Sequence, residues 1–134
     1  MFNFVWNFTK EGFEECKAVE NNDAQDYVGN VRVGNLCFDI VQLDDEDKPL
    51  WIDCYVGGVD SGYGYGEDDY PYDYVSEVGA SFDLDEYKNF TYEQFVEIVE
   101  KELTDSINNK PQYTADNGEI VNLIDKANEE LRIW

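Results

Sequence analysis

Acids and tyrosines are the residues of this chain that could carry chemistry, because histidine is absent. Without it the chain lacks the commonest general base and metal ligand, which excludes Ser/His/Asp catalysis, Cys/His catalysis and histidine-based zinc sites. The cysteines Cys16, Cys37 and Cys54 are odd in number, widely spaced and without a CxxC pair, so neither a disulfide framework nor a zinc site is indicated. Cys37 is predicted to lie beside Arg32 on the polar face of the sheet, but many carboxylates are near it, so the pKa of its thiol should be raised, which disfavours a nucleophile.

Acidic residues and tyrosines are concentrated between Asp44 and Asp73, where Lys48 is the only basic residue. Glycines and Pro71 predict an irregular surface segment over residues 57–74. Tyrosine gives a large contact area at low entropic cost and carboxylates attract Lys and Arg, so this composition suits a surface that binds a basic partner. The alternative is a solvated loop whose tyrosines fold back on the sheet. The predicted partner-binding residues are Asp60, Tyr63, Tyr65, Glu67, Asp68, Asp69, Tyr70, Tyr72, Asp73 and Tyr74.

A second candidate is a pair of carboxylates, Asp39 and Asp53, on neighbouring predicted strands. In one register the two face each other, and such a pair can bind a divalent metal or share a proton. A slip of two residues pairs Asp39 with Tyr55 instead, and Arg32 lies on the same face. Like charges are rarely left directly opposed, so a salt-bridged surface cluster is favoured over a metal site. No metal and no other cofactor is predicted.

The elements that must position these residues follow from apolar periodicity. Alternation over residues 2–8 predicts a first strand, and Thr9 is placed to cap a short helix with Phe13, Cys16 and Val19 on its apolar side.

A hairpin is predicted around Gly34-Asn35, since glycine at the first central position suits a type II′ turn. This turn sets a register in which Val33 faces Leu36. The strands expected in the resulting meander cover residues 27–33, 36–43, 50–56 and, as a short return, 75–82.

Two C-terminal helices are predicted to cover one face of this sheet. Thr91 and Gln94 fit a capping box at the start of the first. The apolar stripe of the first helix is Phe95, Val99, Leu103 and Ile107, and that of the second, after Gly118, is Ile120, Leu123, Ile124, Ala127, Leu131 and Trp134. Trp51 and Tyr55 then fall with Asp53 on the other face, where they form a docking surface or, as we favour, lie under the first helix. The fold class is therefore α+β, a mainly antiparallel sheet packed on one face by two C-terminal helices, in a single domain covering residues 1–134.

The charge of the chain is strongly negative, with 31 acidic against nine basic residues and a formal net charge of −22. A hydrophobic content of 43% can still furnish a core, so a folded protein with an acidic surface is favoured over disorder. Such a surface repels nucleic acid and anionic membranes and attracts basic proteins. No signal-type segment or membrane-length apolar run is present, so we expect a cytoplasmic protein, monomeric when free, with no direct contact to nucleic acid or membrane.

This layout resembles the acidic immunity proteins that bacterial polymorphic toxin systems encode beside their toxins. The resemblance covers size, acidity, the α+β pattern and the acidic, tyrosine-rich segment from Asp60 to Tyr74. It implies a cytoplasmic inhibitor that covers the active site of a toxin, often a basic nuclease. We therefore expect a protein-binding inhibitor and not an enzyme, whose partner is a toxin or a nucleic-acid-binding enzyme. Two alternatives remain open: a DNA-mimicking antirestriction or anti-defence protein of a mobile element, and an Asp/Glu-dependent metal enzyme.

Overall fold

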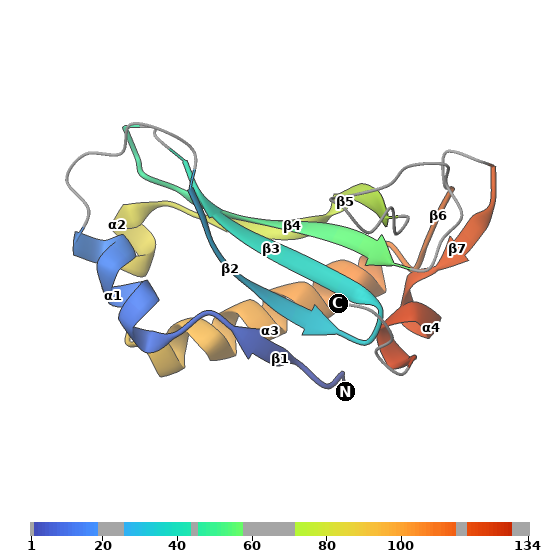
Figure 1. Cartoon of the computed structure of the whole chain (residues 1–134), viewed down its shortest axis with the longest axis horizontal. Coiled ribbons are helices and arrows are strands. Elements are labelled where there is room, and N and C mark those ends of the chain that lie inside the picture. The colour runs from blue at the N-terminus through green and yellow to red at the C-terminus, as the bar shows by residue number, and fades with distance from the viewer. Residues whose placement is uncertain (1, 19–25, 44–45, 58–71, 115–117, 130–134) are drawn as a thin grey trace.

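A five-stranded antiparallel sheet forms the centre of the molecule, in a computed structural model that describes residues 2–18, 26–43, 46–57, 72–114 and 118–129 (Figure 1). Each strand pairs with the next strand along the chain, as expected for a meander. In order across the sheet, the strands are β1 (Val5–Asn7), β2 (Asp26–Val33), β3 (Leu36–Gln42), β4 (Leu50–Gly57) and β5 (Tyr72–Phe82). The remaining elements are the helices α1 (Lys10–Ala18), α2 (Leu84–Tyr87), α3 (Tyr92–Asn109) and α4 (Leu123–Asn128), and a two-stranded sheet of β6 (Gln112–Thr114) and β7 (Ile120–Asn122).

The hairpin between β2 and β3 has the predicted register, with Val33 opposite Leu36. Gly34 has a φ of 57°, whereas Asn35 has no positive φ, and this combination is that of a type II′ turn. The turn also packs against α4. A Cβ atom at Gly34 would lie 2.5 Å from the carbonyl oxygens of Lys126 and Ala127, and the Asn35 amide donates a hydrogen bond to the Lys126 carbonyl at 2.9 Å. Glycine is therefore required here both by backbone conformation and by space.

The long C-terminal helix covers the apolar face of the sheet, as the sequence predicts. Thr91 and Gln94 form the expected capping box of α3. The whole predicted stripe is buried: Phe95, Val99, Leu103 and Ile107. It lies against sheet residues that include Val31, Phe38 and Ile52, and together they form the hydrophobic core of an α+β fold.

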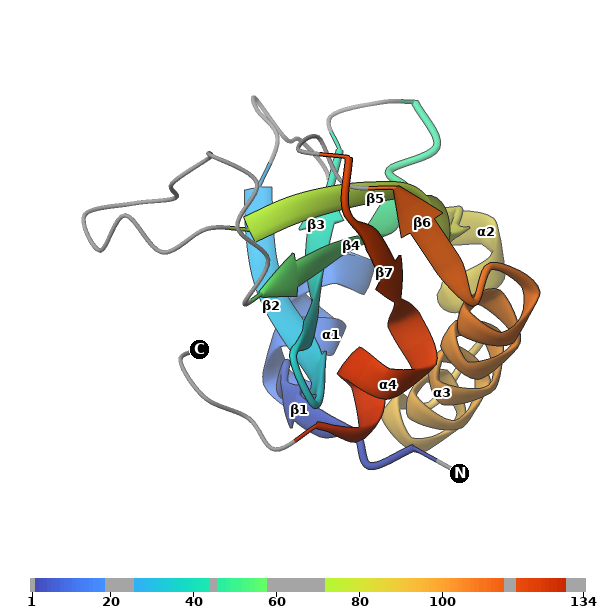
Figure 2. The same ribbon diagram turned by 90° about the vertical axis from the view of Figure 1, so that its right-hand side faces the viewer.

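The first helix lies on the same side of the sheet as α3, so the expectation that it covers Trp51 and Tyr55 is wrong (Figures 1 and 2). The reason is the aromatic side chain of Phe13. Its ring stacks on that of Phe95 in α3, with 4.6 Å between centroids, and it also meets Phe8. These contacts bury Phe13 completely, which a position on the polar side of the sheet would not do.

The second C-terminal helix begins later than predicted. Ile120 belongs to β7 and is 69% exposed, so it is not part of a helical stripe. Helix α4 starts only after Asn122, whose side chain accepts a hydrogen bond from the Asp125 amide and caps the first turn. Leu123 and Ala127 are buried as expected, while Leu131 and Trp134 lie outside the described residues.

The return strand β5 is longer than the predicted segment 75–82, since it begins at Tyr72. The prediction of an irregular segment up to Tyr74 is therefore wrong for its last three residues. Pairing with β4 extends this far because Tyr55 and Val56 continue the ladder, opposite Tyr74 and Asp73.

Candidate functional site

The outer face of the sheet, which points away from α3, presents the functional side chains that the structure describes. Because the strands are in antiparallel register, its residues form three rows that run across the sheet. The central row is Asn7, Asn30, Asp39, Asp53 and Gly79. One flanking row is Tyr27, Val41, Trp51 and Ser81, and the other is Val5, Arg32, Cys37, Tyr55 and Tyr74. No helix of the described residues covers this face.

Two carboxylates meet at the centre of the outer face. Asp39 lies directly opposite Asp53, so of the two predicted registers the slipped one, with Asp39 opposite Tyr55, is not adopted. Burial raises the pKa of both carboxyl groups, and the charge of Asp53 raises that of Asp39 further. The two side chains therefore resist being ionised together in the folded protein.

The salt bridge expected between Arg32 and these carboxylates does not form. The ion pairs of the described residues all lie elsewhere, within α1, α2, α3 and α4 or at their ends. Arg32 lowers the pKa of Asp39 only as a more distant charge, and its buried Nε has no hydrogen-bond partner. Among the described residues, the pair is thus without a direct counter-ion.

Cys37 occupies the flanking row between Arg32 and Tyr55 and is only 5% exposed. Its Sγ donates a hydrogen bond of 3.6 Å to Asp39 Oδ1. Burial, with the charge of Asp39 as the second cause, raises the pKa of the Cys37 thiol to about 12. The predicted rise is confirmed, and the group holds its proton at neutral pH.

Aromatic side chains stand on both sides of the carboxylates. Trp51 is 47% exposed in one flanking row, and Tyr74 is 54% exposed in the other. The rings of Tyr55 and Tyr74 lie 5.4 Å apart between centroids. Burial raises the pKa of Tyr74, and the charge of Asp53 adds to this rise, which shows that the phenol and the carboxylate share one electrostatic environment.

Most of the predicted partner-binding residues lie outside the described residues. These are Asp60, Tyr63, Tyr65, Glu67, Asp68, Asp69 and Tyr70. For Tyr72 and Asp73 the structure describes the backbone, which is part of β5. Tyr74 is placed on the outer face beside Asp53, so the end of the acidic segment and the carboxylate pair belong to one surface.

Tyr27 is a residue of this surface that sequence reasoning did not single out. It is exposed on the outer face, and its hydroxyl accepts a hydrogen bond of 2.6 Å from Asn30 Nδ2. Asn30 Oδ1 in turn accepts one from Asn7 Nδ2 at 3.0 Å. The alternation of apolar and polar residues along residues 27–33 was the available signal, but the irregular pairing between Tyr27 and Gly29 changes the phase.

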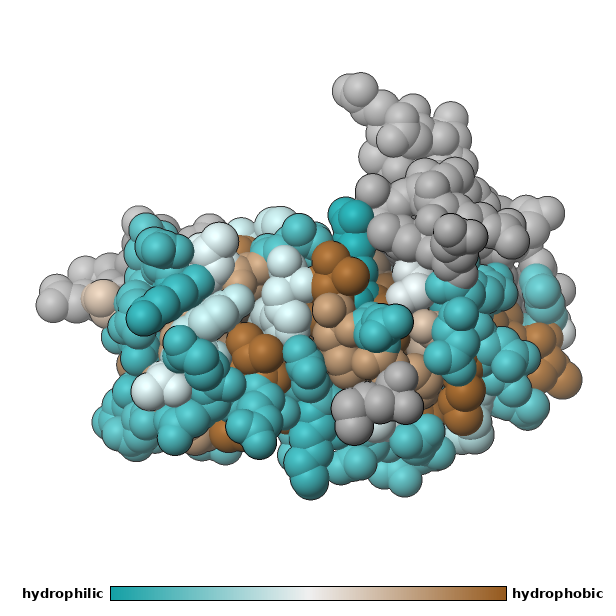
Figure 3. Space-filling model, turned by 90° about the horizontal axis from the view of Figure 1, so that it is seen from below, coloured by the Kyte–Doolittle hydropathy of each residue, from teal (hydrophilic) through white to brown (hydrophobic). Residues whose placement is uncertain are grey.

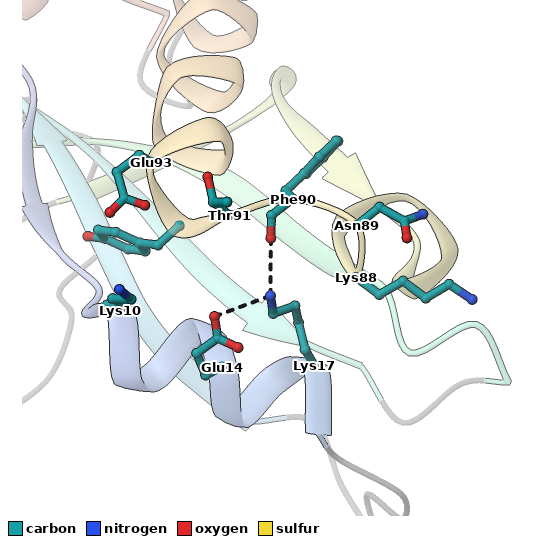
Figure 4. Close-up of a pocket in the computed structure, with 9 residues that line it drawn as sticks. Lys10, Glu14, Lys17, Lys88, Asn89, Phe90, Thr91 and Glu93 are labelled. Atoms are coloured by element: carbon teal, nitrogen blue, oxygen red, sulfur yellow. Dashed lines mark hydrogen bonds and ion pairs between the residues drawn. The ribbon is translucent and has the colours of Figure 1, made fainter.

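A cavity of about 380 Å³ lies between α1 and the start of α3 (Figure 4). Three lysines line it, Lys10, Lys17 and Lys88, which is unusual in so acidic a chain. Two of them form ion pairs with neighbouring acids. Lys17 donates to the Phe90 carbonyl at 3.1 Å and pairs with Glu14 at 3.2 Å. Lys88 points away and pairs with Asp85. The bond from Lys17 to Phe90 joins α1 to the α2–α3 connection, and the two ion pairs are local to α1 and to α2, so the fold explains the roles of both lysines.

The helix side of the molecule is mostly hydrophilic, with apolar side chains gathered near its middle (Figure 3). Phe2, Phe4 and Trp6 are partly buried against the core, and Trp6 Nε1 donates to Glu100 Oε2 at 2.8 Å. Trp6 is thus a packing residue, as predicted. No helix in the described part of the chain has the length and apolar character to cross a membrane.

The described side chains include no group of three or more cysteine, aspartate or glutamate residues arranged to hold a metal ion. Comparison with models of protein families, with curated proteins and with solved structures found no match to this chain. The arrangement that remains is a surface of aromatic rings around two carboxylates without a direct counter-ion, which is suited to contact with a cationic group.

Proposed function

We propose that this protein is an acidic protein-binding inhibitor that acts as an immunity protein and neutralises a basic, nuclease-like toxin. The observation that supports it is the outer face, where Asp39 and Asp53 lie among exposed aromatic side chains. Aromatic residues are enriched at the centres of protein interfaces, and a net charge of −22 accelerates encounter with a basic partner.

The acidic, tyrosine-rich segment from Asp60 to Tyr74 is the second part of the proposed interface. The end of this segment, Tyr74, lies on the outer face opposite Tyr55, two residues along β4 from Asp53. We propose that the segment supplies further acidic and tyrosine contacts at the centre or rim of the interface. Rim carboxylates would act mainly on the association rate, and a buried tyrosine on dissociation.

DNA mimicry is less well supported. A mimic needs carboxylates spaced like phosphates along a smooth surface, whereas the outer face has only two carboxylates in its central row, with tryptophan and tyrosine beside them. We propose a cytoplasmic location, because Cys16, Cys37 and Cys54 are buried and none of them forms a disulfide, which suits a reducing compartment.

The test is inhibition of the product of a neighbouring reading frame that encodes a basic, nuclease-like domain. We expect nuclease activity to fall in proportion to added inhibitor and to vanish near an equimolar ratio. Polyglutamate of equal total charge is the control for non-specific electrostatic inhibition, and it should require a much larger amount. Nuclease activity that survives about tenfold molar excess of the protein at micromolar concentration would contradict the proposal.

A further inference from the structure

The carboxylate pair on the outer face is electrostatically incomplete. Asp39 and Asp53 face each other on adjacent strands, where like charges destabilise a sheet. Arg32 forms no ion pair with either, and the position opposite Asp53 on the other side is Gly79, which has no side chain. Two carboxyl groups are therefore held side by side without an ion pair to any described cation.

The surroundings of the pair favour a flat cation. Trp51 and Tyr55 lie two residues before and after Asp53 on β4, which places them ~7 Å from it along the strand. Tyr74 stands beside Tyr55 and is more than half exposed. Aromatic residues therefore flank the carboxylates on two sides, and aromatic rings attract cations.

We propose that this site receives an arginine side chain of the partner, whose guanidinium donates to Asp39 and Asp53 and lies against the rings of Trp51 and Tyr74. The inference rests on the proposed function and names the chemistry of its central contact. Arginine is preferred to lysine because the planar guanidinium donates to two carboxylates at once and stacks on aromatic rings, whereas ammonium is a compact, strongly hydrated charge.

The experiment uses the full chain and two probes, an oligo-arginine and an oligo-lysine peptide of equal length, in calorimetric titrations at ~0.15 M salt. The parent should bind oligo-arginine more tightly. The double variant Asp39→Asn/Asp53→Asn should bind oligo-arginine ~10-fold more weakly, since it keeps the shape of both side chains and removes their charge. Trp51→Ala, at an exposed position, should weaken oligo-arginine binding ~3-fold or more and leave oligo-lysine binding nearly unchanged.

The matched control is Glu97→Gln/Glu102→Gln, which removes the same charge from exposed positions of α3. It should change oligo-arginine affinity by less than ~3-fold at this salt concentration. Equal weakening in the two double variants, or equal affinity of the parent for the two peptides, would overturn the arginine site.

Nuclease inhibition separates this inference from the proposed function. If Asp39→Asn/Asp53→Asn inhibits the nuclease as well as the parent does, the arginine site is wrong and the inhibitor proposal stands. If the parent binds oligo-arginine but inhibits no basic neighbour, the inhibitor proposal fails on its own.

Discussion

At the scale of single residues, Asp39 and Asp53 are the most strained electrostatic feature of the described surface. An acid whose pKa is higher in the folded than in the unfolded chain destabilises the fold once the pH exceeds its unfolded value, because the folded state resists ionisation. Burial raises the pKa of both groups in this direction. The destabilisation therefore grows as the pH rises from the unfolded pKa towards the folded pKa, and it is complete above the folded pKa.

We expect Asp53→Asn to increase the free energy of unfolding at pH 7 by about 0.5 kcal/mol, a value discounted for the partial exposure of the side chain. The gain should disappear below the unfolded pKa of aspartate, where both forms are neutral. Urea denaturation followed by circular dichroism measures it. Glu102→Gln, at an exposed site on α3, is the control, and an equal gain there would show that only net charge matters.

At the scale of elements, the β2–β3 turn links the sheet to the short helix α4. Gly34 permits both the turn and the close approach of the Lys126 and Ala127 carbonyls. Gly118 also has a positive φ, of 87°, but a Cβ atom there would meet no atom within 4 Å. A substitution at Gly118 therefore adds backbone strain alone, whereas one at Gly34 adds both backbone strain and a steric clash.

Gly34→Ala should lower the free energy of unfolding by ~2 kcal/mol or more, because it adds a clash with α4 to the strain of a positive φ. Gly118→Ala should cost only the strain, ~1 kcal/mol. Thermal and urea denaturation of the two variants give the difference. Equal losses would mean that α4 does not pack on the turn.

The sequence predicted correctly those elements that are specified by residues close together in the chain. Thr91, Gln94 and the i+4 apolar stripe specify α3, and Gly34-Asn35 specifies the register of β2 against β3. The pairing of Asp39 with Asp53 belongs to β3 and β4, and for these two strands the sequence left two registers open. The side on which α1 packs is different, since it depends on Phe13 finding Phe95, more than 80 residues away in sequence. The same limit applies to β7, where tertiary pairing with β6 overrides a helix-like spacing of apolar residues.

The aromatic and acidic surface could be anticipated only in part. Period-2 alternation places Trp51, Asp53 and Tyr55 on one face. It does not show whether another element covers that face, or that Arg32 lies close to the carboxylates without an ion pair, because both depend on packing and side-chain geometry. The role of residues 60–70 stays a prediction.

At the scale of the whole molecule, negative charge dominates the energetics. The chain carries a net charge of −22, and its described ion pairs are local, between residues three or four positions apart on helices. Such exposed pairs contribute little to stability and do not offset repulsion among the remaining acids. The folded state gathers these charges more closely than the unfolded chain does.

We expect salt to stabilise the protein for this reason. Raising NaCl from ~0.02 M to ~0.5 M shortens the screening length several-fold and should raise the midpoint of thermal unfolding by several degrees. Differential scanning calorimetry at fixed pH measures the shift. A midpoint that stays constant or falls would show that attractive ion pairs, and not repulsion, dominate the surface.

The order of the strands has a consequence for how the protein is made. All five strands of the main sheet precede α3 in the sequence, so they leave the ribosome before the helix that covers their apolar face. Until residues 92–109 emerge, Val31, Phe38 and Ile52 lack the helix that buries them in the finished molecule. A nascent chain at that stage exposes an apolar surface that is prone to aggregation, and this is the stage at which we expect the greatest need for a chaperone.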